Sequence, residues 1–207
     1  MDRPGRALSG LLTAIAKLYR RDAAAYGLAC LADVANHLEG LSERRATWPQ
    51  PATLPVVEHL DAALQSRRKG PLADIVDCMA DAAPYCQWRQ NANYVADPGM
   101  SDFVQRYGYA EIVGSRAFFP SDTLLCGVLL IGPGTTYPRH HHPAEEVYHV
   151  LAGTAEWQRG DAAWQSHPAG TAIHHPPMLP HAMRTLDEPL LSLYCWVGNV
   201  GVAARLS

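Results

Sequence analysis

The hydrophobic period of this chain changes near residue 100, and this change restricts the possible folds more than any other feature of the sequence. In the first hundred residues, apolar side chains recur three or four positions apart, which is the spacing of one helix face. The first stripe consists of Leu8, Leu11, Leu12, Ile15, Leu18 and Tyr19. Further stripes follow near residues 28–38, 56–64 and 72–79. We therefore predict a helical N-terminal region over residues 1–100, whose stripes pack against a core.

Short runs rich in Val, Ile, Leu, Tyr and Trp occupy the chain after Phe103, separated by Gly, Pro and Asp. The runs are AEIVG, TLLCGVLLIGPG, EEVYHVLAG, TAEWQRGD, GTAIHHPP and LLSLYCWVG. Such runs are typical of β-strands. Their spacing favours a sandwich or small barrel over a parallel sheet with helical crossovers. The sequence therefore predicts a mainly β domain over residues 101–207, with a seam near Pro98 and Gly99.

The length, composition and charge of the chain limit its partners. A length of 207 residues allows one good core with an extension, since domains typically contain about 100 to 150 residues. The formal net charge of −3 argues against a nucleic-acid surface, and no run approaches the ~18 apolar residues of a membrane span. The five cysteines are scattered and lack CxxC spacing, which favours a reducing cytoplasm. We therefore expect a small-molecule partner, with no nucleic acid and no membrane.

The stretch YPRHHHPAEEVYHVLAG, residues 137–153, contains four of the ten histidines. Because side chains alternate along a strand, His140 and His142 should point to one face and His141 to the other. A strand that resumes after the following turn could aim Glu146 at the same interior. Neutral imidazoles and one carboxylate suit a divalent transition metal such as Zn, Fe, Ni or Mn. The stretch therefore predicts a site for one such ion.

The spacing of these residues resembles the two metal-binding motifs of the cupin superfamily. The first match is Gly134-x5-His140-x-His142-x3-Glu146-x6-Gly153, and the second is Gly170-x5-Pro176-x-Met178-x2-His181-x3-Thr185. The second match departs from the family pattern at Met178, where a glycine is usual, and at Thr185, where an asparagine is usual. The resemblance implies a single cupin (jelly-roll) β-barrel that binds one metal through His140, His142, Glu146 and His181.

The remaining histidines are assigned to the surface or to packing. His141 and His149 have the wrong strand parity for the metal site. The others are His37, His59, His167, His174 and His175. A solvated loop would explain any one histidine of the cluster, so it is the spacing of the whole set that favours a metal site.

Four aromatic side chains could serve a substrate bound near this metal. Tyr194 and Trp196 share one face of the predicted strand LSLYCWVG, where they could contact the substrate. Tyr137 and Tyr148 flank the first motif. A nearby divalent cation should lower the pKa of a tyrosine from its reference of about 10, which would let it act as a base. Packing inside the barrel is the alternative role for each tyrosine.

A second resemblance narrows the chemistry. The helical half and the stretches YCQWRQ, RYGYAEIVG, YPRHHHPAEEVYHVLAG and LPHA resemble the bacterial cupin-type dimethylsulfoniopropionate (DMSP) lyases, most strongly from about Tyr85 to Gly198. That family cleaves DMSP to dimethyl sulfide and acrylate. The resemblance implies the metal ligands named above, Tyr148 or Tyr137 as the general base, and Trp196 in the pocket wall. It predicts a carbon–sulfur lyase with a small zwitterionic substrate.

Other functions fit the same residues, since one barrel can host several chemistries. Three histidines and a glutamate also suit an Fe(II) dioxygenase or another enzyme acting on a small carboxylic acid, and a non-catalytic cupin could merely bind a small molecule. Oxygen consumption would separate a dioxygenase from a lyase, and Tyr148→Phe would separate a lyase from a binder. We expect the helical region to cover one face or the mouth of the barrel, where it could also form a homodimer contact.

Overall fold

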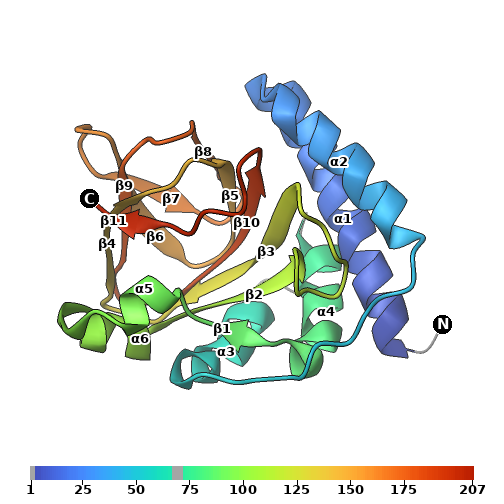
Figure 1. Ribbon diagram of the computed structural model, residues 1–207, viewed down its shortest axis with the longest axis horizontal. Helices are drawn as coiled ribbons and strands as arrows, with labels where there is room; N and C mark the ends of the chain where they lie inside the picture. Colours follow the sequence, from blue (N-terminus) through green and yellow to red (C-terminus); the bar gives the residue numbers. More distant parts are fainter. Residues whose placement is uncertain (1–2, 67–71) are drawn as a thin grey trace.

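The computed structural model describes residues 3–66 and 72–207, and it shows a layer of helices beside a two-sheet barrel (Figure 1). The helices of the first part are α1 (Arg3–Tyr26), α2 (Ala29–Ser42), η1 (Pro55–His59), α3 (Leu60–Gln65), α4 (Ala73–Ala82) and η2 (Ala83–Tyr85). Each predicted apolar stripe coincides with these segments to within one residue, so the prediction of helices is confirmed. Within the described ranges, no helix has the length and apolar character that crossing a membrane requires.

Short elements join the helices to the barrel. They are β1 (Trp88–Arg89), α5 (Ala92–Val95), η3 (Pro98–Met100) and α6 (Ser101–Gln105). The side chains of Asn91 and Asp97 accept hydrogen bonds from backbone N–H groups at the starts of α5 and η3, which is the usual way in which such residues begin a helix. Strand β1 pairs with the first long strand of the barrel, at residues 107–113, so sheet structure begins before residue 100. The last helix, α6, comes after β1 in the chain.

The strands form two antiparallel sheets. They are β2 (Tyr107–Val113), β3 (Leu124–Ile131), β4 (Thr136–His141), β5 (Glu145–Ala152), β6 (Thr154–Arg159), β7 (Gln165–Pro168), β8 (Ala172–His175), β9 (His181–Thr185), β10 (Leu190–Val197) and β11 (Arg205–Leu206). One sheet has the order β1-β2-β3-β10-β5-β8, and the other has the order β11-β4-β9-β6-β7. The mainly β architecture expected after Phe103 is therefore confirmed.

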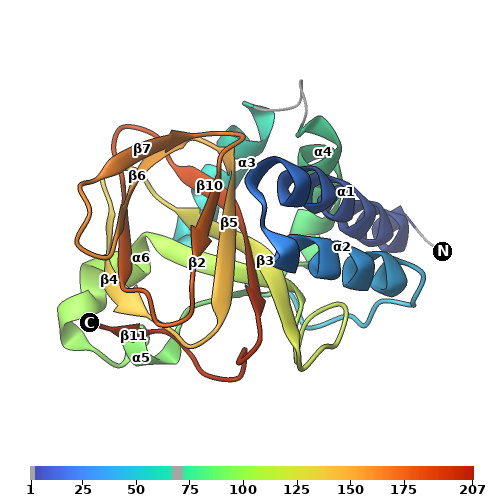
Figure 2. The same ribbon diagram turned by 90° about the horizontal axis from the view of Figure 1, so that it is seen from above.

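The six-stranded sheet buries both of its faces. Its outward side chains, such as Val147 and Leu193, share one core with Leu11 and Ile15 of α1. Its inward side chains, such as Tyr148, pack in a second core between the two sheets. Figure 2 shows α1 and α2 lying along this outer face. The helical layer thus covers one face of the barrel, which fits the near-continuous apolar character of β3 and β10.

One buried ion pair crosses from the helices to the barrel. Asp22 of α1 lies 2.8 Å, oxygen to nitrogen, from His149 of β5, and both side chains are almost fully enclosed. Burial favours the neutral acid, but contacts with His149 and Arg21 outweigh it and lower the pKa of Asp22. His149, which the strand alternation excluded from the metal site, therefore faces the helices, and its contact with Asp22 attaches α1 to the sheet.

The two departures from the second cupin motif are accommodated locally. Met178 adopts φ 63°, in the left-handed region that glycine would occupy freely, and its backbone N–H donates to the carbonyl of His142. The Thr185 hydroxyl donates to the carbonyl of Gly132 at 2.6 Å and accepts from the N–H of Thr135. Met178 therefore adopts the turn conformation of a glycine just before β9. Thr185, at the end of β9, bonds the loop that precedes β4.

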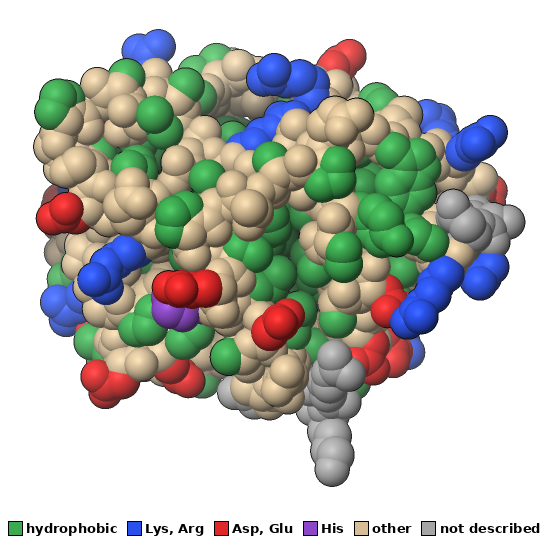
Figure 3. Space-filling view, turned by 90° about the horizontal axis from the view of Figure 1, so that it is seen from below, with side chains coloured by type: hydrophobic (Ala, Val, Ile, Leu, Met, Phe, Trp, Pro, Cys, Tyr) green, Lys and Arg blue, Asp and Glu red, His purple; other side chains and the backbone are tan. Residues whose placement is uncertain are grey.

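The surface does not separate charges by sign on the face drawn in Figure 3. Acidic and basic side chains are dispersed there among hydrophobic ones. This pattern agrees with the small formal net charge of −3, and it is unlike the basic stripe of a nucleic-acid surface.

Candidate metal centre

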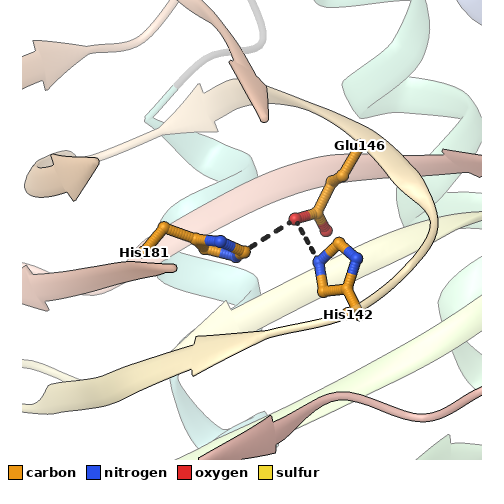
Figure 4. Close-up of side chains that lie close together, drawn as sticks. All are labelled: His142, Glu146 and His181. Carbon is orange, nitrogen blue, oxygen red and sulfur yellow. Dashed lines mark hydrogen bonds and ion pairs between the residues drawn. The ribbon is translucent and has the colours of Figure 1, made fainter. Parts of the chain in front are cut away.

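Three of the predicted metal ligands converge between the two sheets. His142, Glu146 and His181 each offer a ligand atom, and these atoms all lie within 4.8 Å of one another. Glu146 Oε2 is 3.0 Å from His142 Nε2 and 3.3 Å from His181 Nε2. Figure 4 shows the two imidazoles pointing at one carboxylate oxygen from opposite sides. All three side chains are buried, so a bound cation would be shielded from solvent.

The backbone orients the imidazoles so that one nitrogen of each remains free. The Nδ1 atoms of His140, His142 and His181 lie 2.8 to 3.0 Å from backbone carbonyl oxygens two residues away. A carbonyl only accepts hydrogen bonds, so the neutral rings donate from Nδ1 and keep the lone pair of Nε2. Metal-binding histidines in proteins are usually held in this way.

His140 stands beside these three residues. It pairs with His181 across β4 and β9, and the centroid of its ring is 4.2 Å from that of His181 and 6.4 Å from that of His142. Burial, as the larger cause, and the neighbouring His181, as the second, lower the pKa of His140 well below its ordinary value. The ring is therefore neutral, as a metal ligand must be. His141 points away and contacts the Ser207 hydroxyl, in agreement with the predicted alternation.

Besides the predicted ligands, Trp196 and His175 each approach one oxygen of the Glu146 carboxylate. The indole N–H of Trp196 donates to Oε1 at 2.5 Å, and its ring stacks on His142 with centroids 4.0 Å apart. Burial disfavours the charged form of Glu146, but the facing imidazoles, His142 foremost, hold the pKa of this carboxyl well below its ordinary value. Trp196, expected in the pocket wall, therefore also supports a candidate ligand.

The second group is His175, which the sequence assigned to the surface or to packing. Its side chain is fully buried, with Nδ1 3.4 Å from Glu146 Oε2. Burial, as the larger cause, and the neighbouring His181, as the second, lower the pKa of His175 to about 3. The register explains its position, because His175 lies directly opposite Glu146 across β8 and β5. The sequence alone did not give this register.

A cavity of about 680 Å³ opens beside the cluster. Its wall includes Glu146 and all four predicted aromatic residues, which are Tyr137, Tyr148, Tyr194 and Trp196. Tyr194 lies opposite Tyr148, and Trp196 lies opposite Glu146, across β10 and β5. These two cross-strand pairs lie next to each other on the same face of the sheet. Gly127 lies next to Tyr194 on β3, where a Cβ atom would collide with that ring and with the Ala110 carbonyl.

The two candidate bases have different surroundings. Burial, as the larger cause, and the negative charge of Glu146, as the second, raise the pKa of Tyr148 well above its ordinary value. Tyr137 stacks on His140 with centroids 4.0 Å apart and donates its hydroxyl to Tyr94 at 3.3 Å. Burial and the neighbouring Tyr107 and Tyr94 raise its pKa as well. Either tyrosine would therefore need a nearby positive charge to lose its proton.

The donor set fits a divalent transition metal. His181 Nε2 is buried and makes no hydrogen bond within the described chain, which is costly for a polar atom unless another partner satisfies it. It faces the same carboxylate oxygen as His142 Nε2. Neutral imidazole nitrogens with one carboxylate are the ligands that Zn, Fe, Ni and Mn share, so the geometry does not select among these metals.

An antiparallel two-sheet barrel with histidines and a glutamate facing its interior defines a cupin-type protein with a site for a small molecule. Comparison of sequences gives the family. The sequence model of the dimethylsulfoniopropionate lyases matches residues 29–192, so this chain belongs to that family and is a lyase. The prediction from the cupin motifs and the flanking stretches is confirmed at this level.

Individual relatives agree with this assignment. The dimethylsulfoniopropionate lyase DddQ of Ruegeria pomeroyi is 31% identical over all of this chain and 97% of its own length. The crystal structure of that lyase superposes with a TM-score of 0.80 at 28% identity, covering 100% of this chain and 98% of the other. A chain from the crystal structures of the lyases RdDddP and RnDddQII gives 0.74 at 28% identity, covering 98% and 99%.

Proposed function

We propose that this chain is a metal-dependent DMSP lyase built on a cupin jelly-roll barrel, and that it releases dimethyl sulfide and acrylate by β-elimination with Tyr148 as the general base. The family assignment supports cleavage of DMSP. The observation that carries the rest is the convergence of Glu146, Tyr148, Tyr194 and Trp196 on one cavity beside buried imidazoles.

The ligand set in this proposal is His140, His142, Glu146 and His181. A divalent cation bound there would supply positive charge next to the substrate carboxylate and the Tyr148 hydroxyl. The backbone carbonyls that accept hydrogen bonds from the Nδ1 atoms turn the imidazoles so that Nε2 of each ring is left for the cation. The Trp196 N–H holds the second oxygen of Glu146.

The proposed reaction needs a base and little else from the side chains. The Tyr148 phenolate takes a proton from the carbon next to the substrate carboxylate. The electrons of that C–H bond form the new C=C bond, and the electrons of the C–S bond leave with sulfur as neutral dimethyl sulfide. A sulfonium is a good leaving group, so no strong general acid is required. The proton on Tyr148 then returns to solvent.

Tyr148 supports this role better than Tyr137 does. Its hydroxyl faces the Glu146 carboxylate, close to the candidate cation position, whereas the hydroxyl of Tyr137 is directed at Tyr94. Tyr194 and Trp196 occupy the neighbouring strand, directly across from Tyr148 and Glu146. Their ring faces could hold the sulfonium, a contact worth about 0.5–2 kcal/mol.

The experiment is headspace detection of dimethyl sulfide from purified protein of known metal content, incubated with DMSP without oxygen. We expect release by the wild type and none after chelation. Tyr148→Phe should lower turnover by about 10²- to 10⁴-fold with metal content unchanged, because only the base is lost. Tyr137→Phe is the matched control, which keeps the ring on His140 and should have the smaller effect.

Two results would contradict the proposal. Wild-type protein with one bound metal that releases no dimethyl sulfide would exclude this substrate. Oxygen uptake with other small acids would then indicate a dioxygenase. Release that survives in Tyr148→Phe and falls in Tyr137→Phe would transfer the role of base to Tyr137.

A further inference from the structure

His175 lies at the candidate metal centre without belonging to either cupin motif as a ligand. The residue is fully buried on β8, directly opposite Glu146 on β5. Its neighbour His174 points the other way and contacts Glu145 at 2.8 Å, with both side chains partly exposed. Adjacent histidines of one strand therefore have different surroundings, which makes them a natural pair for comparison.

The contacts of His175 connect two of the candidate ligands. Its Nδ1 is 3.4 Å from Glu146 Oε2, and its ring lies against that of His181 with centroids 3.9 Å apart and planes 10° from parallel. Neither ring nitrogen makes a hydrogen bond within the described chain. A buried imidazole with two unsatisfied nitrogens is poorly suited to packing alone.

The way in which His175 is held differs from that of the three predicted ligand histidines. Those rings are anchored through Nδ1 to backbone carbonyls, so that Nε2 is left free. In His175 it is Nδ1 that faces the carboxylate. Trp196 occupies the other oxygen of the same carboxylate, so the two side chains stand on opposite oxygens of Glu146.

We propose that His175 is a positioning residue of the metal centre, which donates from Nδ1 to Glu146 Oε2 and supports the ring of His181. It would thereby fix the direction in which both groups present their ligand atoms. This inference rests on the proposed metal dependence, but it concerns a residue to which the ligand motifs give no role.

The test measures cation binding directly, with Co²⁺ and Zn²⁺ ions as probes. The dissociation constants are obtained by competition with a chelator, and the visible spectrum of the Co²⁺ protein reports the geometry around the ion. We expect His175→Leu to weaken binding by about 10- to 100-fold, as is common when a residue supporting a ligand is lost, and to alter the spectrum. His174→Leu, the matched control, should leave both unchanged.

Two conservative variants keep the test decisive if His175→Leu does not fold. Asparagine places an amide donor near the position of Nδ1, whereas glutamine places it near Nε2. We therefore expect His175→Asn to retain most of the wild-type affinity and His175→Gln to lose it. The melting temperature of each metal-free variant reports whether it is folded.

The possible results distinguish a failure of the proposed role of His175 from a failure of the proposed metal dependence. Unchanged affinity and an unchanged Co²⁺ spectrum in folded His175→Leu, or equal losses in the asparagine and glutamine variants, would overturn the role of His175 while leaving a metal-dependent lyase intact. A wild-type protein that releases dimethyl sulfide without binding either cation would overturn the metal dependence, and this inference with it.

Discussion

The two faces of strand β5 each bury a histidine beside a carboxylate, yet the two pairs have different surroundings. On the inner face, Glu146 lies 3.0 Å from His142 and borders the cavity. On the outer face, His149 lies 2.8 Å from Asp22, within the core shared by α1 and the sheet. Burial and pairing alone therefore do not identify a functional site in this protein.

The number of groups that meet at one atom distinguishes the inner pair. Oxygen Oε2 of Glu146 faces ring nitrogens of His142, His175 and His181 within 3.4 Å, whereas one ion pair needs a single partner. Asp22 faces only one buried imidazole, that of His149, and the neighbouring Arg21 guanidinium. An excess of converging ligand atoms beside a cavity is what a bound ion and its substrate require, whereas a one-to-one pair suffices to attach a helix.

The largest effect should follow from breaking the inner pair. Glu146→Gln removes the one anionic candidate ligand, so we expect turnover to fall by more than the ~10- to 100-fold that accompanies loss of a supporting residue. The rise in melting temperature on adding metal should disappear as well. Dimethyl sulfide release and calorimetric melting would measure these two effects. Full activity in Glu146→Gln would remove the functional distinction between the two faces.

Breaking the outer pair should act on stability instead. Asp22→Ala leaves His149 buried without its partner, so we expect the free energy of unfolding to fall by ~3–5 kcal/mol, as for other broken buried pairs. Turnover per folded molecule should not change. The double variant Asp22→Leu with His149→Leu should recover most of the loss, since an apolar pair has no charge to desolvate. Denaturant titration of the wild type and the two variants provides the measurement.

The same pair should make stability sensitive to acid. The pKa of Asp22 is lowered in the folded protein, so its contribution is present above the unfolded pKa of ~3.9 and is lost as the pH falls through the folded value. Unfolding free energies of wild type and Asp22→Asn should therefore converge as the pH drops below about 4. Measurement in the Glu146→Gln background removes the similar contribution of the inner carboxylate. Parallel curves would show that Asp22 is not held ionised by its partners.

The smallest effect is expected at the partly exposed end of the strand. Glu145 contacts His174 at 2.8 Å, but solvent reaches both side chains. Exposed pairs typically contribute about 0–1 kcal/mol, so Glu145→Gln should change stability within that range and leave dimethyl sulfide release intact. A large loss of turnover would mean that the site extends beyond the inner face of β5.

Most of the fold could be predicted from the sequence, because periodicity is a local signal. The stripe from Leu8 to Tyr19 and the runs around Gly127 and Tyr194 fall within elements of the expected kind. The cupin spacing likewise predicts that His142, Glu146 and His181 lie together, and the structure brings them within 4.8 Å of one another. Their roles, together with those of His140 and the four aromatic residues, stay predictions, of which the variants of Glu146, Tyr148 and Tyr137 test the first part.

The features that sequence analysis missed depend on pairing between distant segments. Whether His174 or His175 points inward depends on the register of β8 against β5, and a shift of one residue would exchange them. Asp22 carried a weak signal, since it continues the apolar stripe three residues after Tyr19. A carboxylate on a buried helix face implies a buried partner, but nothing in the local pattern identified His149.

The hydrogen bonds from Nδ1 to the backbone have a consequence for how this centre can vary during evolution. The acceptors are the carbonyls of Pro138, Ala144 and Leu179, and no amino-acid substitution can delete a carbonyl oxygen. The orientation of the imidazoles is thus insulated from most point mutations. Glu146 instead contacts two replaceable side chains, Trp196 and His175, which in our proposal set its orientation. If the centre binds a metal as proposed, variation in its metal preference should accumulate at those two positions.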